Sequence, residues 1–378
     1  MKNTEKTIIQ KEIVDFLDPK PHGRLLLAPR LGKTKLIIDI IKKNNPQSIL
    51  WVTPMPHLAD EEIPAEFETW KAKKFLSKLK TTTWKSLNKL KGHYTTIILD
   101  EEQFATELNT STLLSGELTA DYIISMTGAQ TKHENKTIIY DRLNLPVLYK
   151  FDINEAVDVG ILSNYSIKVV EIAMDNELNV EAGNKTKKFM TSESANYNYL
   201  TKAMQSALNQ RRPDAKFKIL NRMRAVYNSK TKTEAAKTII ENEKGRKLMF
   251  CASIKQAEEL CKNTYHSKTD NTNLKAFIKG DIDEVSMVNT GGVGTTYKGI
   301  DHLLMTQADS DNNGLTTQKI CRTLLYQENY EATVWILCLV GTQDEKWVKS
   351  ALENFDPSKV EYIRYNNLKQ QYNVTKMD

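Results

Sequence analysis

The chain has little cysteine, and its few cysteines follow no pattern. Four cysteines and six histidines occur in 378 residues, with no Cys-x-x-Cys spacing and with the histidines scattered singly. A disulfide framework or a clustered zinc site needs such spacing, so both are excluded. The expected setting is a reducing, intracellular one.

Long apolar runs are missing as well. No stretch reaches the length that spans a membrane, and residues 1–17 lack the continuous apolar core of a signal peptide. An apolar fraction of 40% and a charged fraction of 26% are typical of a chain that buries substantial cores. We therefore expect a soluble protein without a membrane partner, and 378 residues are enough for two domains.

Charge of either sign is not in large excess overall, but basic residues are concentrated in one segment. The net charge is +6, whereas residues 185–232 hold twelve Lys or Arg and two acidic residues, giving +10 there and −4 elsewhere. Such a segment is either a solvated helical face or a surface for nucleic-acid phosphates. The candidate contact residues are Arg211, Arg212, Lys216 and Lys218.

Short apolar runs alternate with longer amphipathic stretches, which is the pattern of parallel sheets joined by crossover helices. The predicted strands of the first half are residues 24–28, 48–53, 95–99 and 122–126. Those of the second half are residues 167–173, 247–252, 285–289, 302–306 and 334–340. The pattern predicts an α/β protein with two sheets.

A boundary near residues 150–160 divides these two halves. We predict domains at residues 1–155 and 156–378, the latter with a basic helical segment at about 185–232 and a helical tail from about 342. No separate accessory domain is expected in so short a chain.

The stretch RLLLAPRLGKTKLIIDII reads as a strand, a loop and a helix. Its residues 28–34, named the phosphate loop, would place Gly32, Lys33 and Thr34 at a helix N-terminus, where backbone N–H groups attract anions. Lys33 would bind the β- and γ-phosphates of ATP, and the Thr34 hydroxyl would ligate Mg²⁺. Arg30 would add a positive charge beside the phosphates. The Gly-Lys-Thr tripeptide alone is weak evidence, but its context favours a nucleotide site.

A second polar cluster, residues 100–103 or the DEEQ box, follows the predicted strand 95–99. Because parallel strands present their carboxyl ends at one edge, we expect this box beside the phosphate loop. There Asp100 would hold Mg²⁺, and Glu101 would orient and deprotonate the attacking water. The alternative is two solvent-facing acids, with Asp100 capping a helix.

With both elements in place, the chain resembles the superfamily 2 DExx-box helicases and translocases. Seven stretches match motifs of that family in the family's order: SILWVTPMPHLADEEIPAEFETW (48–70), the DEEQ box, SMTGAQ (125–130), RKLMFCASIKQAEELC (246–261), TYHSKT (264–269), GGVGTTYKGID (291–301) and TTQKICRTL (316–324). INEAVDVGILSNYSIKVVEI (153–172) is similar to the passage between domains in phage recombination helicases and restriction-enzyme motor subunits. The resemblance implies two tandem RecA-like parallel-sheet domains with an ATP cleft between them.

The resemblance also assigns roles to single residues. Gln10 matches the position that reads adenine, with a plain surface glutamine as the alternative. Gln318 and Arg322 match the first Gln and first Arg of a Q-x-x-G-R-x-x-R motif, whose arginines reach ATP. The alternative for Arg322 is a surface ion pair. The motif's Gly and last Arg are Cys321 and Leu325 here, which leaves Arg322 as its one candidate arginine finger and puts efficient turnover in doubt.

Contacts to nucleic acid are expected from hydroxyls and backbone N–H groups of the same motifs, which meet phosphates and carry little sequence information. The candidate side chains are Thr53, His57 and Thr295, although each is also suited to capping a helix or ending a strand. Thr127 would couple hydrolysis to movement of the domains.

The sequence thus predicts a helicase or translocase that uses ATP and Mg²⁺, as a monomer in the cytoplasm of a bacterium or a phage-infected host. DNA is favoured over RNA as its partner by analogy with the phage-type relatives. An RNA helicase, a nucleic-acid-binding protein with a weakened ATPase, and a phosphate-loop enzyme that never touches nucleic acid remain alternatives. Intact Lys33 and Glu101 argue against the second, and the second α/β half argues against the third.

Overall fold

The computed structural model describes the chain except for residues 1, 18, 129–139, 184–185, 289–296, 310–313, 328–329 and 376–378. Two compact units are present. Unit 1 comprises Met1–Ser163 and Asp311–Arg322, and unit 2 comprises Asn164–Ser310 and Thr323–Asp378. Among the described residues, no helix is long and apolar enough to cross a membrane.

Unit 1 is built on a six-stranded sheet of order β3-β2-β4-β5-β1-β6, in which all neighbours are parallel. Its strands are β1 (Gly23–Leu27), β2 (Ile49–Thr53), β3 (Leu79–Thr83), β4 (Gly92–Asp100), β5 (Leu118–Thr127) and β6 (Val147–Phe151). Every residue of β1 and β2 is buried, because both strands are covered on both faces, and all but Arg24 of β1 and Thr53 of β2 lack a polar side chain. The edge strands β3 and β6 are partly exposed and were not among the predicted strands.

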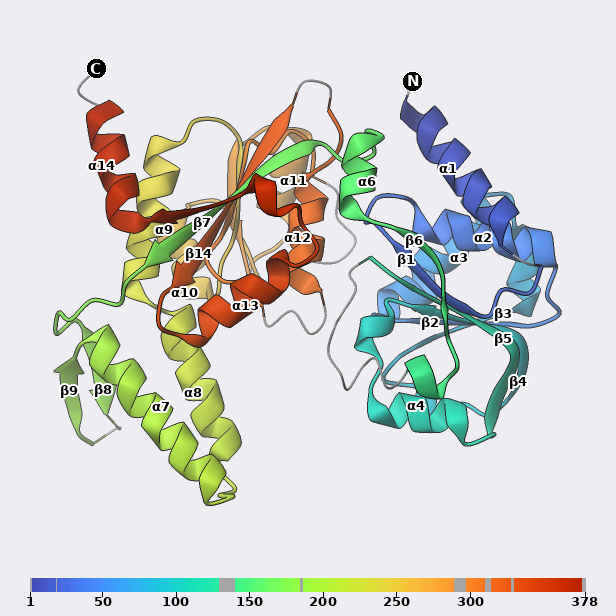
Figure 1. Cartoon of the computed structure of the whole chain (residues 1–378), viewed down its shortest axis with the longest axis horizontal. Coiled ribbons are helices and arrows are strands. Elements are labelled where there is room, and N and C mark those ends of the chain that lie inside the picture. Colours follow the sequence, from blue (N-terminus) through green and yellow to red (C-terminus); the bar gives the residue numbers. More distant parts are fainter. Residues whose placement is uncertain are drawn as a thin grey trace. The chain divides into compact units, whose positions relative to one another are not determined.

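Helices cover both faces of this sheet (Figure 1). They are α1 (Lys2–Phe16), α2 (Lys33–Asn44), α3 (Ile63–Thr69), α4 (Glu107–Leu114) and α6 (Ile153–Asp158), with short turns η1 (Leu58–Glu62), η2 (Lys73–Lys78), η3 (Leu87–Lys89) and η4 (Glu102–Phe104). Alternation along β2 sends Trp51 against Phe67 of α3, with ring centroids 6.0 Å apart. Leu50 and Val52 point the other way, into a core cluster with Trp84. The sheet is therefore packed on both sides.

Unit 2 carries a seven-stranded parallel sheet of order β11-β12-β10-β13-β14-β7-β15. Its strands are β7 (Asn164–Ile172), β10 (Lys247–Phe250), β11 (Thr264–Tyr265), β12 (Glu284–Met287), β13 (His302–Met305), β14 (Glu331–Leu339) and β15 (Val360–Arg364). Its helices around the sheet are α9 (Lys230–Asn242), α10 (Ile254–Leu260), α11 (Thr272–Lys279), α13 (Gln343–Leu352) and α14 (Tyr365–Thr375), with the turn η6 (Pro357–Lys359). Two parallel α/β sheets confirm the predicted fold class.

Two segments of the second half of the chain differ from their sequence description. The C-terminal part predicted as a helical tail holds α13, α14 and the strand β15, which pairs with β7. The helix α12 (Leu315–Thr323) follows β13 in sequence, yet the residues up to Arg322 group with unit 1.

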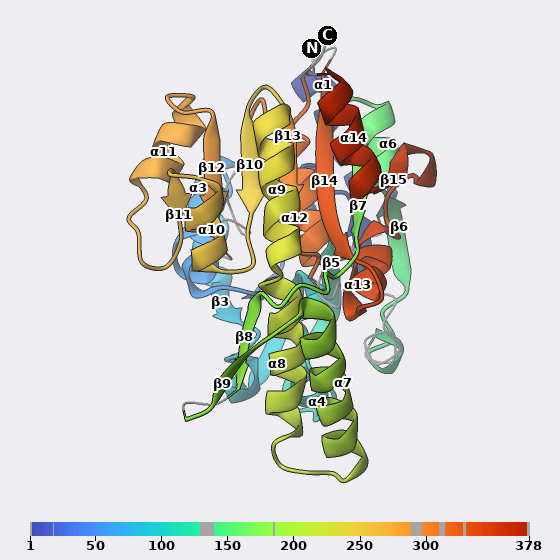
Figure 2. The same cartoon turned by 90° about the vertical axis from the view of Figure 1, so that its left-hand side faces the viewer.

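An accessory module, residues 176–229, is inserted between β7 and α9 of unit 2. It contains an antiparallel hairpin, β8 (Val180–Gly183) with β9 (Lys188–Thr191), and two long helices, α7 (Glu193–Asn209) and α8 (Ala215–Tyr227). Figures 1 and 2 show α7 and α8 side by side, extending away from the sheet of their unit. The module belongs to unit 2 and is not a separate domain, but helical periodicity alone did not reveal that α7 and α8 extend away from the sheet.

The stem of this module is held by two carboxylates. Glu193 at the start of α7 accepts hydrogen bonds from the backbone N–H of Lys230, at 2.5 Å, and from the hydroxyl of Thr231, at 2.6 Å. The hydroxyl of Thr231 also lies 3.4 Å from a carboxylate oxygen of Asp175. One turn into α9, Lys232 forms a fully buried ion pair with Asp344. Lys232 is therefore not part of any basic surface.

Candidate nucleotide site

Three functional segments meet at one edge of the unit 1 sheet because of the strand order. The strand β5 lies between β4 and β1, with Asp100 opposite Met126 and Leu26 opposite Thr127. All three strands are parallel, so their carboxyl ends lie together. The DEEQ box, Thr127 and the phosphate loop thus follow adjacent strands.

The phosphate loop turns sharply between β1 and α2. Gly32, directly before α2, has φ 82°, and Arg30 also has a positive φ of 74°. A Cβ on Gly32 would stand 2.6 Å from the Gln10 amide, so glycine is required both by the backbone and by the space. The first N–H groups of α2 have no partner within a helix and are available to an anion.

Lys33 extends from α2 to the DEEQ box. Its ammonium group forms an ion pair with Glu101 at 2.6 Å, and both side chains are largely buried. Gly128, which follows β5, leaves room for this pair, since a Cβ there would lie 2.9 Å from the lysine nitrogen. The loop lysine and the candidate catalytic carboxylate are therefore in direct contact.

The two neighbouring acids of the box have different proton affinities. Burial, together with the adjacent Glu101 carboxylate, raises the pKa of Asp100 to about 7. Burial also acts to raise the pKa of Glu101, but the charge and hydrogen bond of Lys33 and the amide of Gln103 outweigh it and lower that pKa. Glu101 is thus held ionised. Asp100 ends β4 instead of capping a helix, so the alternative of a capping residue does not hold.

Gln103 connects Glu101 to the end of β5. Its side-chain N–H donates to Glu101 at 2.8 Å, and its carbonyl oxygen accepts from the Thr127 hydroxyl at 2.7 Å. Gln103 and Thr127 are both buried. The sequence placed Gln103 in the box without assigning it a role. The feature of the sequence that could have indicated this role is its position two residues after Glu101. The short turn between them brings the two side chains within hydrogen-bonding distance.

The helix α12 adds further contacts within unit 1. The Gln318 side chain donates to the same carboxylate of Glu101 at 3.1 Å. Arg30 of the phosphate loop donates to the backbone carbonyl of Arg322 at 2.9 Å. Cys321 is fully buried beside them, and its burial raises the thiol pKa to about 12, so it is held as a neutral thiol.

Gln10 is not a surface residue. It is 2% exposed, and its amide donates to the carbonyl of Leu31 at 2.6 Å, inside the phosphate loop. Lys6 lies one helical turn earlier, and its ammonium stands 3.3 Å from the Cβ position of Gly32. Burial and the nearby Arg30 and Lys35 lower the pKa of Lys6. The sequence analysis missed Lys6, although its spacing of four from Gln10 places both on one helical face.

Glu102 has a structural partner. It is buried against Arg24, with nitrogen-to-oxygen distances of 2.9 and 2.6 Å, and it also accepts a hydrogen bond from Ser125. Arg24 in turn stacks over the ring of Tyr140, 3.8 Å from its centroid. This closed set of contacts anchors the turn that carries Glu101 and Gln103.

The candidate nucleic-acid residues lie in different settings. Thr53 is fully buried at the end of β2, and within the described residues its hydroxyl makes no hydrogen bond. His57 is exposed, 3.6 Å from Glu62. Thr295 lies outside the described residues.

The basic candidates lie on the accessory module. Arg211, Arg212 and Lys216 are exposed, and Lys218 is half-buried. Asp214 pairs with Arg212 at 2.7 Å and with Lys218 at 3.8 Å. Arg211 and Lys216 make no ion pair in the described part of the chain, so they are the freer charges of this group.

The residues at this edge also suit a magnesium ion. Mg²⁺ prefers oxygen ligands and is usually held by one or two carboxylates together with substrate phosphates. Asp100 ends β4, and Thr34 lies in the first turn of α2, after β1, at the same carboxyl edge of the sheet. Burial is the main cause of the raised Asp100 pKa of about 7, and the Glu101 charge adds to it. A divalent cation beside Asp100 would favour its ionised form, so the donor set fits the ion.

Comparisons with solved structures decide the fold. The ATP-dependent Type ISP restriction-modification enzyme LlaBIII bound to DNA is 13% identical with a TM-score of 0.58, over 95% of this chain and 31% of that one. Dbp5 of S. cerevisiae, bound to RNA and ADP BeF3, is 10% identical with a TM-score of 0.56, over 98% and 92%. The Hef helicase domain of Pyrococcus furiosus is 13% identical with a TM-score of 0.50, over 92% and 97%. The chain therefore shares the fold of these proteins.

This fold agrees with the two tandem RecA-like domains that the motifs implied. No family model matches the sequence, and no curated protein matches it. The fold is therefore apparent from the motif order and from the structure at an identity as low as 10–13%.

Proposed function

We propose that the chain is an ATP-dependent nucleic-acid helicase or translocase. The observation that carries the proposal is the set of hydrogen bonds that Glu101 accepts. Its carboxylate is bound by the side chains of Lys33, Gln103 and Gln318, which come from three separate motifs. Lys33 and Gln318 are far apart in sequence, and a surface glutamate has no need of such partners. The arrangement suits a carboxylate that must stay ionised and fixed in place.

In this proposal ATP binds at the phosphate loop. The N–H groups at the start of α2 and the ammonium of Lys33 would face its phosphates, and Arg30 would add charge. Mg²⁺ held by Asp100 and Thr34 would neutralise charge on the phosphates. Gln10 would act through its hydrogen bond to Leu31, which fixes the loop, as well as toward adenine.

Lys33 would bind either Glu101 or the phosphates of ATP. In the protein alone it pairs with Glu101 at 2.6 Å, and phosphates would compete for the same ammonium. Once Lys33 turns to the phosphates, one oxygen of Glu101 is released to accept a proton from the attacking water. Gln103 and Gln318 keep the other oxygen in position.

Movement would be coupled to this chemistry through Thr127. Its hydroxyl bonds Gln103, so a shift of Glu101 is passed to the end of β5. Arg322 would serve as the arginine finger that stabilises charge in the transition state. The domains proposed for this cycle are residues 1–155 and 156–378.

DNA is the proposed track, by analogy with the phage-type motifs in the sequence. His57 and Thr295 would contact its phosphates, joined by the basic residues of the accessory module, whereas the predicted contact from the Thr53 hydroxyl does not fit its full burial. Four cysteines that are buried and free suit a reducing cytoplasm, bacterial or phage-infected, and a monomer is proposed.

The test is ATP hydrolysis by the purified chain, with and without single-stranded DNA, duplex DNA and RNA. Stimulation by one polymer supports a motor and identifies its track. Glu101→Gln should retain ATP binding while hydrolysis falls. Hydrolysis that no polymer changes would instead support a phosphate-loop enzyme of another kind.

A second candidate is a nucleic-acid-binding protein with a weakened ATPase. The observation in its favour is Leu325, which stands where the related motif has its last arginine. Nucleic-acid binding without measurable hydrolysis, by a chain that still binds ATP, would favour this candidate over the motor.

A further inference from the structure

The accessory module encloses a cavity that belongs to none of the helicase motifs. Its volume is about 780 Å³, within the range of roughly 300–1,000 Å³ found for small-molecule and cofactor sites. The hairpin β8–β9 and the helices α7 and α8 form its walls. It therefore lies wholly within unit 2.

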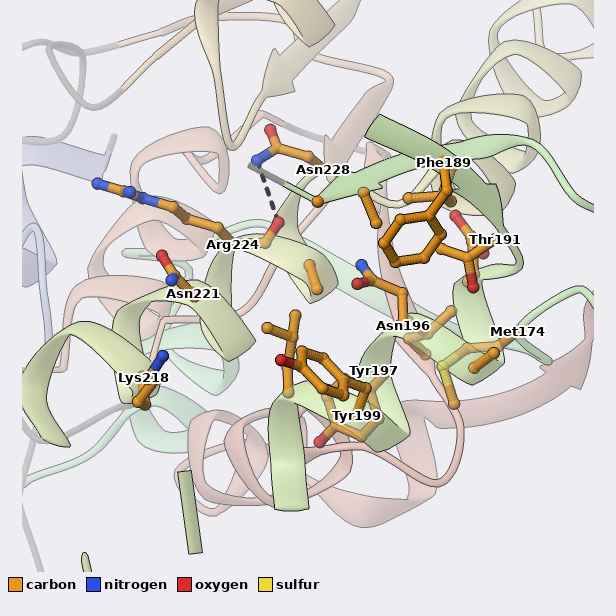
Figure 3. Close-up of a pocket in the computed structure, with 18 of the residues that line it drawn as sticks. Met174, Phe189, Thr191, Asn196, Tyr197, Tyr199, Lys218, Asn221, Arg224 and Asn228 are labelled. Atoms are coloured by element: carbon orange, nitrogen blue, oxygen red, sulfur yellow. Dashed lines mark hydrogen bonds between the residues drawn. The ribbon is translucent and has the colours of Figure 1, made fainter. Parts of the chain in front are cut away.

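The two sides of the cavity differ in chemistry. Figure 3 shows Phe189 and Thr191 of the β9 side on one side of the cavity and Lys218, Asn221 and Arg224 of α8 on the other, with the Arg224 side chain extending away from Phe189. The Phe189 ring is 55% exposed although it points into the cavity, so one face is open to a ligand. An aromatic ring thus lies on one side of a space of ligand size, and two cationic residues lie on the other side, at its rim.

Several polar groups around the cavity have no partner. Among the described residues, the Arg224 guanidinium makes no ion pair, whereas Lys218 forms a long, partly exposed ion pair with Asp214 at 3.8 Å. The side-chain amides of Asn196 and Asn221 likewise make no hydrogen bond in the described part of the chain. Open donors and acceptors beside an aromatic ring are the groups that recognise a planar, polar ligand.

The one acidic residue that lines the cavity, Glu193, would not repel a bound anion. Glu193 lines the cavity but is only 7% exposed, and its two oxygens accept from Lys230 and Thr231. Its charge is directed to the start of α9. The accessible charge of the cavity is therefore positive, from Lys218 and Arg224.

We propose that this cavity holds one unstacked nucleotide of a single nucleic-acid strand. The base stacks on Phe189, the amides of Asn196 and Asn221 bind its polar edge, and Lys218 and Arg224 bind the adjoining phosphate. Single strands are held in this way by aromatic stacking combined with a positive groove. The inference rests on the proposed function, since it supplies the motor with a second grip on its track.

The test uses the full chain and a single-stranded DNA oligonucleotide that carries one 2-aminopurine. Binding should quench the fluorescence of that base, because it stacks on Phe189. Phe189→Ala should remove most of the quenching and raise Kd roughly tenfold, which is the effect expected when one base can no longer stack on an aromatic ring. The control is Phe217→Ala on α8, since Phe217 is 68% exposed but does not line the cavity, and its Kd should change less than about twofold.

A second pair of variants guards against a folding defect in the hairpin. Arg224→Gln together with Lys218→Gln should weaken binding and reduce its salt dependence while 2-aminopurine quenching at saturation persists. If Phe189→Ala and Phe217→Ala bind alike, the cavity proposal is overturned. Self-association of the chain that only Phe189→Ala abolishes, without a change in oligonucleotide affinity, would also overturn it.

The same assay separates this proposal from the proposed function. Hydrolysis of ATP without nucleic acid should be equal in Phe189→Ala and the natural chain, because the cavity lies outside the nucleotide site. A chain that hydrolyses no ATP, yet shows the Phe189-dependent quenching, would refute the motor and support the cavity. A stimulated ATPase with no Phe189-dependent quenching would do the reverse.

Discussion

The nucleotide site of unit 1 and the cavity of unit 2 differ in how their polar groups are partnered. Around the nucleotide site, Lys33, Glu101 and Gln103 are joined by short hydrogen bonds and are largely buried. Around the cavity, Arg224 and Asn221 are exposed and make no such bond in the described part of the chain. The side chains of the nucleotide site are therefore held in place before a ligand binds, whereas those of the cavity would become ordered only on binding.

This difference fits two kinds of task. A reacting centre needs groups held in place beforehand, because reorganisation during the reaction adds to the barrier. A grip on a moving strand benefits from groups that engage and release, since each contact must be broken at the next step. Single substitutions at the nucleotide site of unit 1 should therefore reduce ATP hydrolysis strongly. Substitutions in the module should reduce nucleic-acid affinity in proportion to the interactions that each one removes.

The largest effect is expected at the lysine of the phosphate loop. Lys33→Ala removes both the partner of Glu101 and the proposed phosphate contact, so ATP hydrolysis should fall by about 10²–10³-fold. Nucleic-acid binding, measured by fluorescence anisotropy, should stay within about twofold. Lys42→Ala on the same helix, whose charge pairs with Asp39, is the control. Full hydrolysis by Lys33→Ala would remove the nucleotide-site assignment.

A large effect on stability is expected beneath the same site. Glu102→Ala leaves the buried Arg24 charge without its carboxylate, which should lower the free energy of unfolding of unit 1 by roughly 3–5 kcal/mol. Urea unfolding followed by tryptophan fluorescence measures this loss. Glu107→Ala, on exposed α4, should change it by less than about 0.5 kcal/mol. Equal free energies of unfolding for the two variants would mean that the buried Arg24–Glu102 ion pair does not stabilise the turn that carries Glu101.

An intermediate effect is expected at the link between Gln103 and β5. Thr127→Val keeps the shape but removes the hydroxyl, and the loss of one buried hydrogen bond corresponds to about a tenfold change. We expect the ratio of nucleic-acid-stimulated to unstimulated hydrolysis to fall by that factor. Thr119→Val, on the exposed start of the same strand, should leave the ratio unaltered. An unchanged ratio in Thr127→Val would mean that Thr127 only supports the turn.

The smallest and most graded effect is expected on the accessory module. Arg211→Glu with Lys216→Glu reverses the two charges that Asp214 does not neutralise, so the slope of log Kd against log salt should decrease by about 0.7 for each phosphate that is no longer neutralised. Reversing Lys275 and Lys279 on α11 is the matched control, with less change expected. If both double variants give the same slope, the basic segment is an ordinary solvated face.

The sequence predicted central strands well and edge strands poorly. All four edge strands, β3, β6, β11 and β15, were absent from the prediction, whereas every other strand of the two large sheets was present. A central strand is buried on both faces and therefore apolar throughout, as in β2. LKTTT of β3 and VEYIR of β15 face solvent in part, so no apolar run marks them.

The same limit applies to the candidate sites. Lys33, Glu101 and Gln318 stand in motifs with local spacing, so the sequence could nominate them singly. The bond between Gln103 and Thr127 depends on β4 and β5 being neighbours, which no local pattern states. The cavity depends on how a hairpin folds against two helices, and that packing leaves no periodic signal in residues 176–229.

The hydrogen bonds at the base of the accessory module imply that the module could be removed or exchanged as a unit. Asp175 and Glu193 hold the entrance of the module beside its exit at Thr231, so the two ends of a long insertion lie within hydrogen-bonding reach. Insertions whose ends are close can be exchanged with little disturbance of the host fold. A short turn in place of residues 176–229 should thus yield a minimal two-sheet core, and modules of other specificity should be transplantable at the same junction.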